Sequence, residues 1–290
     1  MTNIYFIITT VFYGTMLFCS CMQEDANIRN RPVDEPSYSK QTNIFVRSTI
    51  LERFPCPPGY SRKSNTEKTF AAWLETIPLK KEGAPVLLFN GELKSNQRIH
   101  AAVLDFDRGT SDLQQCADAV MRLRAEYLYQ KHAYDSIAFT FTNGSKASYS
   151  KWREGYRPVV IGNSVAWTKS KSRDTSYACF RSYLNTVFMY CGTYSLSKEL
   201  KPVDITEIAE GDVFIYGGFP GHAMIVMDVA VHETSGKKIM ILTQSYMPAQ
   251  DIHIVKNLSD TELSPWYEIP ESGELITPEW SFAVKDLKRF

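Results

Sequence analysis

A thiol, an imidazole and a side-chain amide occur in this 290-residue sequence in an order that suits nucleophilic catalysis. His222 opens an apolar run, and a short Gly/Pro loop separates it from an earlier run, Val213–Tyr216. This pattern predicts an imidazole held at a sheet edge, beside a loop that a substrate could approach. A cysteine hydrolase needs such a base, a thiol of lowered pKa and a polar residue that orients the ring. Gln244, at the end of the next run, could accept a hydrogen bond from the imidazole.

Two cysteines are candidates for the nucleophile. Cys116 precedes small and apolar residues about one turn inside a predicted helix, where the helix dipole could lower the thiol pKa. It also lies on the apolar face of that helix, so a buried structural cysteine is the alternative. Cys179 begins a second predicted helix and is closer to His222 in sequence, but Phe180 takes the position in the apolar face that the thiol should occupy.

Two further polar residues follow the third apolar run. Asp251 and His253 could support the site or join a metal site with His222. Their spacing matches no HExxH or comparable ligand motif, so we predict no metal and no cofactor. His222 could also simply bond to a turn at the start of its strand, and Gln244 could belong to a polar surface loop.

The helices that must carry the cysteines follow from turn residues and hydrophobic periodicity. Gly109–Asp112 predicts the start of a helix that runs to about Lys131, with Arg122 and Glu126 on its solvent side. A second amphipathic helix is expected over Ser176–Cys191.

Consecutive strands should then carry the histidine and the glutamine. They are expected at Val213–Tyr216, Ala223–Val231 and Lys238–Thr243. The segment Lys151–Arg173, rich in Gly, Ser and basic residues, is predicted to be mostly loop. Helices followed by an antiparallel meander indicate an α+β fold.

Residues 1–20 have the features of an export signal. The apolar run Ile4–Phe18 is too short to span a bilayer comfortably, and Ser20 before Cys21 resembles a bacterial lipoprotein box with Cys21 as the lipidated residue. An uncleaved anchor or simple secretion is the alternative. Polar residues 21–45 predict a flexible tether, followed by a single α+β domain over residues 46–290.

Charge and cysteine spacing exclude several classes of protein. Lys+Arg and Asp+Glu are both 32, so no excess of positive charge indicates a nucleic-acid partner. Of six cysteines, two lie in the signal and the others form no CxxC pair, so neither a zinc ribbon nor a thioredoxin motif is expected.

The pattern Gly211-Asp212-Val213 followed by Gly221-His222-Ala223, with its helix–strand–strand order, resembles the NlpC/P60 and CHAP branch of papain-like cysteine hydrolases. This resemblance implies a papain-like fold, with helices packed on an antiparallel sheet, and cleavage of peptide or amide bonds in peptidoglycan. The chain also resembles an uncharacterised family of Bacteroides-type lipoproteins, through segments such as Asp112–Leu128 and Gln244–Asp251.

We therefore expect a cell-envelope protein anchored in the outer membrane by lipid at Cys21, with display on the cell surface as a further hypothesis. Cys116 would attack a peptide or amide bond, His222 would carry the proton and Gln244 would orient the ring, with Cys179 as the alternative nucleophile. The competing hypothesis is a non-catalytic module that binds glycan or peptidoglycan on a degenerate papain-like scaffold.

Overall fold

The sheet is built around the three predicted strands, which form an antiparallel meander. β8 (Val213–Tyr216), β9 (His222–His232) and β10 (Lys238–Gln244) pair in sequence order, as predicted. The computed structural model describes residues 48–65 and 68–290. The predicted signal (1–20), the predicted lipidation site Cys21 and the predicted tether (21–45) therefore lie outside the described residues.

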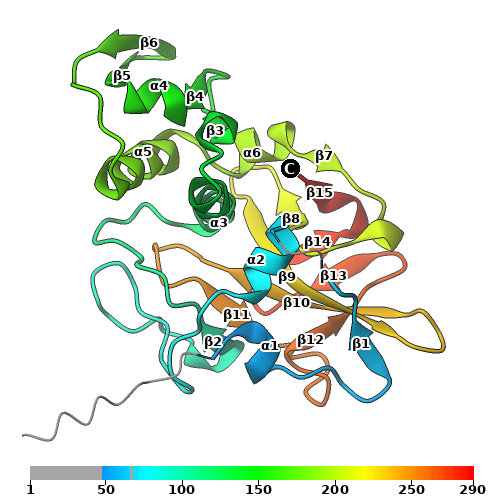
Figure 1. Cartoon of the computed structure of the whole chain (residues 1–290). Coiled ribbons are helices and arrows are strands. Elements are labelled where there is room, and N and C mark those ends of the chain that lie inside the picture. The colour runs from blue at the N-terminus through cyan, green and yellow to red at the C-terminus, as the bar shows by residue number, and fades with distance from the viewer. Residues whose placement is uncertain (1–47, 66–67) are drawn as a thin grey trace, which may run out of the picture. The chain divides into compact units, whose positions relative to one another are not determined.

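Shorter strands extend this meander to a nine-stranded sheet (Figure 1). The strand order is β2-β11-β10-β9-β8-β15-β7, and β1 and β12 pair with β9 and β10 respectively. The added strands are β1 (Tyr60–Arg62), β2 (His100–Val103), β7 (Lys201–Pro202), β11 (His253–Val255), β12 (Trp266–Glu268) and β15 (Leu287–Arg289). Every pairing in it is antiparallel, so the described fold is α+β, as predicted.

Both faces of the central strands are buried. On one face Ile225 and Met227 join a core formed with the helices, and α2 and α3 pack directly on β9. On the other face Met224 and Val226 pack with the C-terminal segment, including Phe282. Burial on both faces explains why β9 is almost continuously apolar rather than alternating.

Helices and short elements complete the described chain. The helices are α1 (Ile50–Arg53), α2 (Phe70–Glu75), α3 (Cys116–Gln130), α4 (Tyr149–Arg153), α5 (Tyr177–Tyr190) and α6 (Thr193–Glu199). Four 3-10 turns lie at Gln97–Ile99, Tyr134–Ser136, Ile205–Glu207 and Val284–Asp286. A small C-terminal hairpin pairs β13 (Glu274–Ile276) with β14 (Ser281–Ala283). Within the described ranges, none of these helices has both the length and the apolar character needed to cross a membrane.

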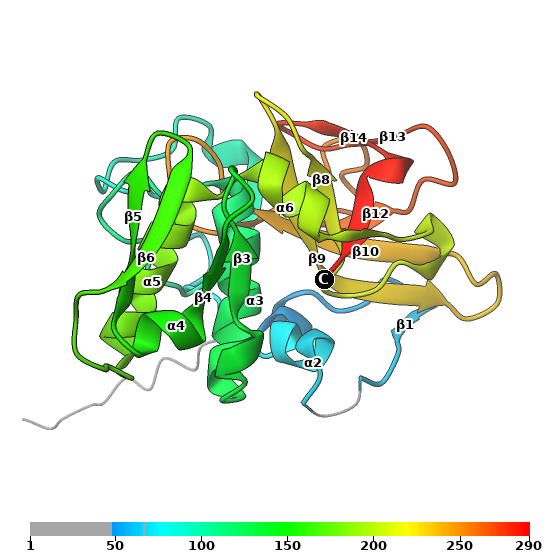
Figure 2. The same cartoon turned by 90° about the horizontal axis from the view of Figure 1, so that it is seen from above.

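The loop prediction for Lys151–Arg173 is wrong. This segment begins inside α4 and then forms a hairpin of β5 (Tyr156–Ile161) and β6 (Ser164–Lys169), which lies with β3 (Ala138–Thr140) and β4 (Lys146–Ser148) beside α5 (Figure 2). Its strands are exposed to solvent on much of their surface, so they carry charged and polar residues at many positions. For this reason the segment lacks the clear alternation of apolar and polar residues that predicts a strand.

The start of α3 also differs from the prediction. The helix begins at Cys116 rather than near Asp112, because Gln115 has an extended backbone and its N–H donates to the side chain of Asp118 (3.0 Å). Asp118 thus caps the helix, and the preceding residues form a loop. The correction places Cys116 at the first helical residue, where the backbone N–H groups are free of intrahelical partners.

Candidate active site

His222 is held at the first position of β9 by a tight loop. Its backbone pairs with Tyr216 at the end of β8, so the residues between them must turn back sharply. Gly221 is packed so closely that an added Cβ would lie 2.3 Å from the Thr193 hydroxyl oxygen and 2.6 Å from the Tyr216 carbonyl oxygen. Only glycine fits there, and α6 therefore fixes the loop that presents the imidazole.

A hydrogen-bond network determines the tautomer of His222. Its Nε2 lies 2.7 Å from Oε1 of Gln244 at the end of β10. The Gln244 amide nitrogen donates to the carboxylate of Glu279 (2.6 Å) and lies 3.3 Å from His253 Nε2. His253 Nδ1 is 2.9 Å from the carbonyl oxygen of Asp251, which can only accept.

The proton positions follow from these partners. His253 Nδ1 carries a proton for the carbonyl, so its Nε2 accepts from Gln244. The Gln244 amide group therefore donates to His253 and Glu279, and its Oε1 accepts from the Nε2–H of His222. A neutral imidazole carries only one proton, so Nδ1 of His222 has a free lone pair and can act as a base.

Cys116 lies beside the strand that carries this base. The backbone N–H groups of Ala117 and Ala223 both act on its thiol, and Ala223 directly follows His222. The thiol also affects the pKa of Tyr246, whose ring centre is 5.1 Å from that of His222. Cys116 is 8 % exposed and His222 is 1 % exposed, so both residues are buried and His222 is the more enclosed of the two.

Burial keeps both groups neutral in this resting arrangement. Desolvation, with a smaller contribution from Asp118, raises the pKa of the Cys116 thiol to about 11, although backbone N–H groups lower it. Desolvation lowers the pKa of His222 to about 4; the bond to Gln244 opposes this shift and the charge of Lys94 adds to it. The expectation of a lowered thiol pKa at Cys116 is therefore wrong, because desolvation outweighs the backbone N–H groups. The site holds a thiol and a neutral imidazole, not a preformed ion pair.

The loop before Cys116 is tied to the segment that follows Gln244. The Ser245 hydroxyl donates to the carbonyl oxygen of Gln114 (2.9 Å), and the N–H of Ala249 donates to the carboxylate of Asp112 (2.6 Å). These bonds join residues more than 130 positions apart in the chain. They fix the thiol-bearing end of α3 against the end of β10.

The prediction that Arg122 and Glu126 face solvent is wrong. Both side chains are buried, and they pair with each other across one helical turn. Arg122 also donates to the side chain of Gln114 (2.5 Å) and to the carbonyl oxygen of Asp107. These charged residues therefore brace the loop that leads to Cys116.

Aromatic side chains surround the imidazole. The ring centres of Trp280 and Phe282 lie 5.5 and 5.8 Å from that of His222, on the side supplied by the C-terminal hairpin. Exposed apolar side chains at the nearby strand ends and loops form an outer rim. Its members are Tyr216, Phe219 and Met247.

The other predicted site residues have separate environments. Cys179, in the first turn of α5, is buried in the core near Trp152 and Arg157, and no contact with an imidazole is found for it among the described residues. Asp251 is fully buried and pairs with Lys80 (2.9 Å), which anchors a loop rather than reaching His222. His253 contributes indirectly, through Gln244.

Two site residues were missed in the sequence. Glu279 accepts from Gln244 and pairs with Lys94 (2.7 Å), so a buried lysine and a carboxylate extend the network. Neither residue stands in a recognisable motif. The signal in the sequence is limited to a C-terminal segment rich in Trp and Pro, which is typical of a segment that packs against the body of a domain.

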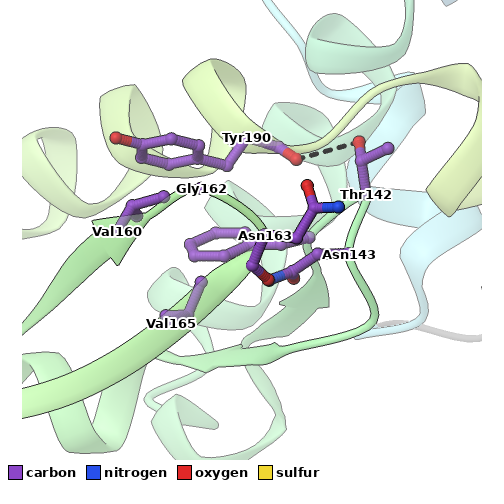
Figure 3. Close-up of a pocket in the computed structure, with 8 residues that line it drawn as sticks. Thr142, Asn143, Val160, Gly162, Asn163, Val165 and Tyr190 are labelled. Carbon is purple, nitrogen blue, oxygen red and sulfur yellow. Dashed lines mark hydrogen bonds between the residues drawn. The ribbon is translucent and has the colours of Figure 1, made fainter.

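The cavity shown in Figure 3 is separate from these residues. It has a volume of about 470 Å³ and lies between the β5–β6 hairpin, the β3–β4 turn and the end of α5. Amide, hydroxyl and aromatic groups line it, including Asn143, Asn163 and Tyr190, whose carbonyl oxygen accepts from the Thr142 hydroxyl. Neither a cysteine nor a histidine is among the residues that line it.

Comparison with known protein families gives a match over most of the chain. A family model described as domain of unknown function (4846) matches residues 50–289. No curated protein and no solved structure matches the chain.

Proposed function

The chain belongs to the family described as domain of unknown function (4846), and from its own residues we propose that it is a cysteine peptidase or amidase. The observation that supports this most strongly is the hydrogen bond from His222 Nε2–H to Gln244, which leaves Nδ1 as a base at the start of β9, next in sequence to Ala223, whose backbone N–H acts on the Cys116 thiol. A thiol at a helix N-terminus, a base and an amide that orients the base are the components of a papain-like site.

The reaction would use a concerted proton transfer. As the Cys116 sulfur attacks the carbonyl carbon of an amide, His222 Nδ1 takes the thiol proton and then gives it to the leaving amine, so that a thioester remains. Water, deprotonated by the same nitrogen, then hydrolyses the thioester and restores the thiol. The free N–H groups of the first turn of α3 would stabilise the oxyanion.

The helix–strand–strand order supports the finer proposal of a papain-like, NlpC/P60-type fold. α3 carries Cys116, β9 begins with His222 and β10 ends with Gln244, and α3 packs on β9. A peptide or amide bond of peptidoglycan is the substrate that this resemblance implies.

The export features of residues 1–21 support a location in the cell envelope. We propose that Cys21 is lipidated, anchoring the protein in the outer membrane, with display at the cell surface open to test. Metabolic labelling with a fatty acid and membrane fractionation should show a labelled, membrane-bound protein. A Cys21→Ser variant that stays labelled and membrane-bound would contradict this proposal.

The activity is tested with muropeptides released from peptidoglycan by a muramidase. We expect amide cleavage by the wild type and a loss of about 10²–10⁴-fold or more in kcat/KM for Cys116→Ala and for His222→Ala. Cys179→Ala is the matched control and should keep wild-type activity. Equal activity of Cys116→Ala and the wild type would refute the proposed nucleophile.

A binding function is the second candidate. The cavity in Figure 3 offers side-chain amides beside an aromatic ring, which suits a glycan. If the protein only binds, it should co-sediment with purified peptidoglycan without cleaving it, and Asn163→Ala should weaken this binding while Cys116→Ala should not.

A further inference from the structure

Three carboxylates from separate elements converge on the helix-covered side of the sheet, away from the residues discussed above. Asp228 lies in β9, Glu75 ends α2 and Glu210 precedes β8. One carboxylate oxygen from each of them lies within 4.8 Å of the others.

An irregularity in β9 accounts for the position of Asp228. In the pairing with β10, Ile241 lies opposite Asp228 and Leu242 lies opposite Val226, so Met227 is an extra residue in a β-bulge. Beyond the bulge the alternation of β9 is shifted by one residue. A bulge of this kind re-aims side chains, and here it brings a carboxylate into the layer where α2 packs on β9.

Only one of the two oxygens of the Asp228 carboxylate accepts hydrogen bonds from another side chain. The side chain is 0 % exposed. Its Oδ2 accepts two bonds from the Arg62 guanidinium, from Nε (2.8 Å) and from a terminal nitrogen (2.7 Å). Its Oδ1 is buried and has no hydrogen-bond partner of normal geometry within residues 48–65 and 68–290, although the Val229 backbone N–H acts on this carboxylate and lowers its pKa. A buried acceptor without a partner is costly, so this oxygen indicates a missing ligand.

The local charge has the sign that a cation would balance. Arg62 pairs with Asp228, and Lys238 lies close enough to Glu210 for this carboxylate to affect the lysine pKa. Three ionised carboxylates against these two cations leave the cluster with a net negative charge. Burial raises the pKa of all three acids, and the charge of Asp228 further raises those of Glu75 and Glu210. A divalent cation would neutralise the cluster.

We propose that Glu75, Glu210 and Asp228 bind a divalent cation of the hard, oxygen-preferring class, with Ca²⁺ as the best fit. Ca²⁺ takes carboxylate and amide oxygens at about 2.3–2.6 Å, so two of its ligands can be up to roughly 5 Å apart. All three carboxylates satisfy this limit. Mg²⁺ needs shorter bonds and stricter octahedral geometry.

Neighbouring groups suit this site. The Asn65 amide nitrogen donates to Glu75 (2.6 Å), which holds a further side-chain amide at the cluster. A cavity of about 530 Å³ adjoins it and gives an ion and its waters a route from solvent; its lining includes Asn65 and Glu210, and also the basic residues Lys63, Lys238 and Arg289. The bound cation would join β9, α2 and the loop before β8, and it does not depend on the proposed hydrolase activity.

Binding is tested on chelator-treated full-length protein with CaCl₂ as the probe. Calorimetry should give one Ca²⁺ per chain, and Tm should rise by about 5–10 °C at 100-fold excess over Kd. Tb³⁺ should give luminescence excited through tryptophan and displaced by Ca²⁺, because the Trp266 ring centre lies 5.3 Å from the Arg62 guanidinium carbon.

Variants separate the cation site from a general effect of calcium. Asp228→Asn should abolish binding. If Asp228→Asn does not fold, a double variant replaces it as the test. Glu75 and Glu210 are half-buried, so Glu75→Gln combined with Glu210→Gln should fold and should weaken Ca²⁺ binding at least tenfold. Asp260→Asn, an exposed aspartate, is the matched control and should bind Ca²⁺ as the wild type does. Absence of stoichiometric Ca²⁺ binding to the wild type would overturn the proposal, as would undiminished binding by the double variant.

Discussion

Acid should lower the free energy of unfolding of this protein through the buried imidazole of His222. Replacing His222 should remove a calculable part of this loss of stability. An unfolded histidine has a pKa of about 6.5, whereas burial lowers the pKa of His222 to about 4 in the fold. Below pH 6.5 the unfolded chain therefore binds a proton that the folded chain excludes. The stability contributed by the neutral imidazole is complete above pH 6.5 and is lost as the pH falls towards 4.

The size of this effect follows from the pKa difference. Between pH 8 and about pH 4.5 the free energy of unfolding should fall by about 2.5 kcal/mol because of His222 alone. A His222→Gln variant keeps an N–H donor for Gln244 but cannot titrate. Its free energy of unfolding should therefore fall by about 2.5 kcal/mol less than that of the wild type over this range.

Urea denaturation at several pH values measures both losses. Each protein is compared with itself at pH 8, so titrating groups that do not interact with residue 222 cancel in the difference. Equal losses for the wild type and His222→Gln, within 0.5 kcal/mol, would refute the reasoning. That result would mean that the imidazole is protonated in the folded state, which is incompatible with the buried, hydrogen-bonded base described above.

Four further substitutions test the supports of the site. Gly221→Ala should lower stability by about 1–3 kcal/mol in thermal or urea unfolding, because its Cβ would clash with Thr193, and it should reduce hydrolysis by displacing His222. Ser245→Ala removes the bond to the loop before Cys116 and should cost about 1–2 kcal/mol and lower kcat. Glu279→Gln weakens the acceptor for Gln244 and should lower kcat about tenfold with little change in KM, measured by steady-state kinetics. Cys179→Ala should cost about 1 kcal/mol in urea unfolding without changing kcat, because the thiol is only a core group. Unchanged kcat in the first three, or lost activity in the last, would contradict these roles.

The sequence was sufficient for the parts of the fold in which local pattern and tertiary packing agree. The meander of β8, β9 and β10 follows from long apolar runs separated by turn residues. The helix α5 begins directly after Ser176, whose side chain accepts from the N–H of Cys179 as an N-terminal cap should. The chain order of Cys116, His222 and Gln244 could likewise be linked to one type of chemistry.

Other features depend on distant contacts and could not be predicted. Asp118 and the Gly/Ser/Asp cluster upstream could each cap the start of a helix, so the sequence alone does not decide between them. In the structure Asp118 accepts from the Gln115 N–H and sets the first residue of α3. Arg122 is buried because Gln114 and the Asp107 carbonyl accept from it, and helical periodicity does not reveal such partners. Glu279 reaches Gln244 only after the C-terminal segment folds back across the sheet.

The most direct test of the central claim is covalent trapping at the proposed nucleophile. The protein is incubated at neutral pH with a peptide vinyl sulfone, a Michael acceptor that reports a thiolate generated by the adjacent base, and is mapped by mass spectrometry. The account predicts one adduct, on Cys116, that forms at least tenfold more slowly in His222→Ala. An adduct on Cys179, or labelling of Cys116 at the same rate in the two proteins, would contradict it.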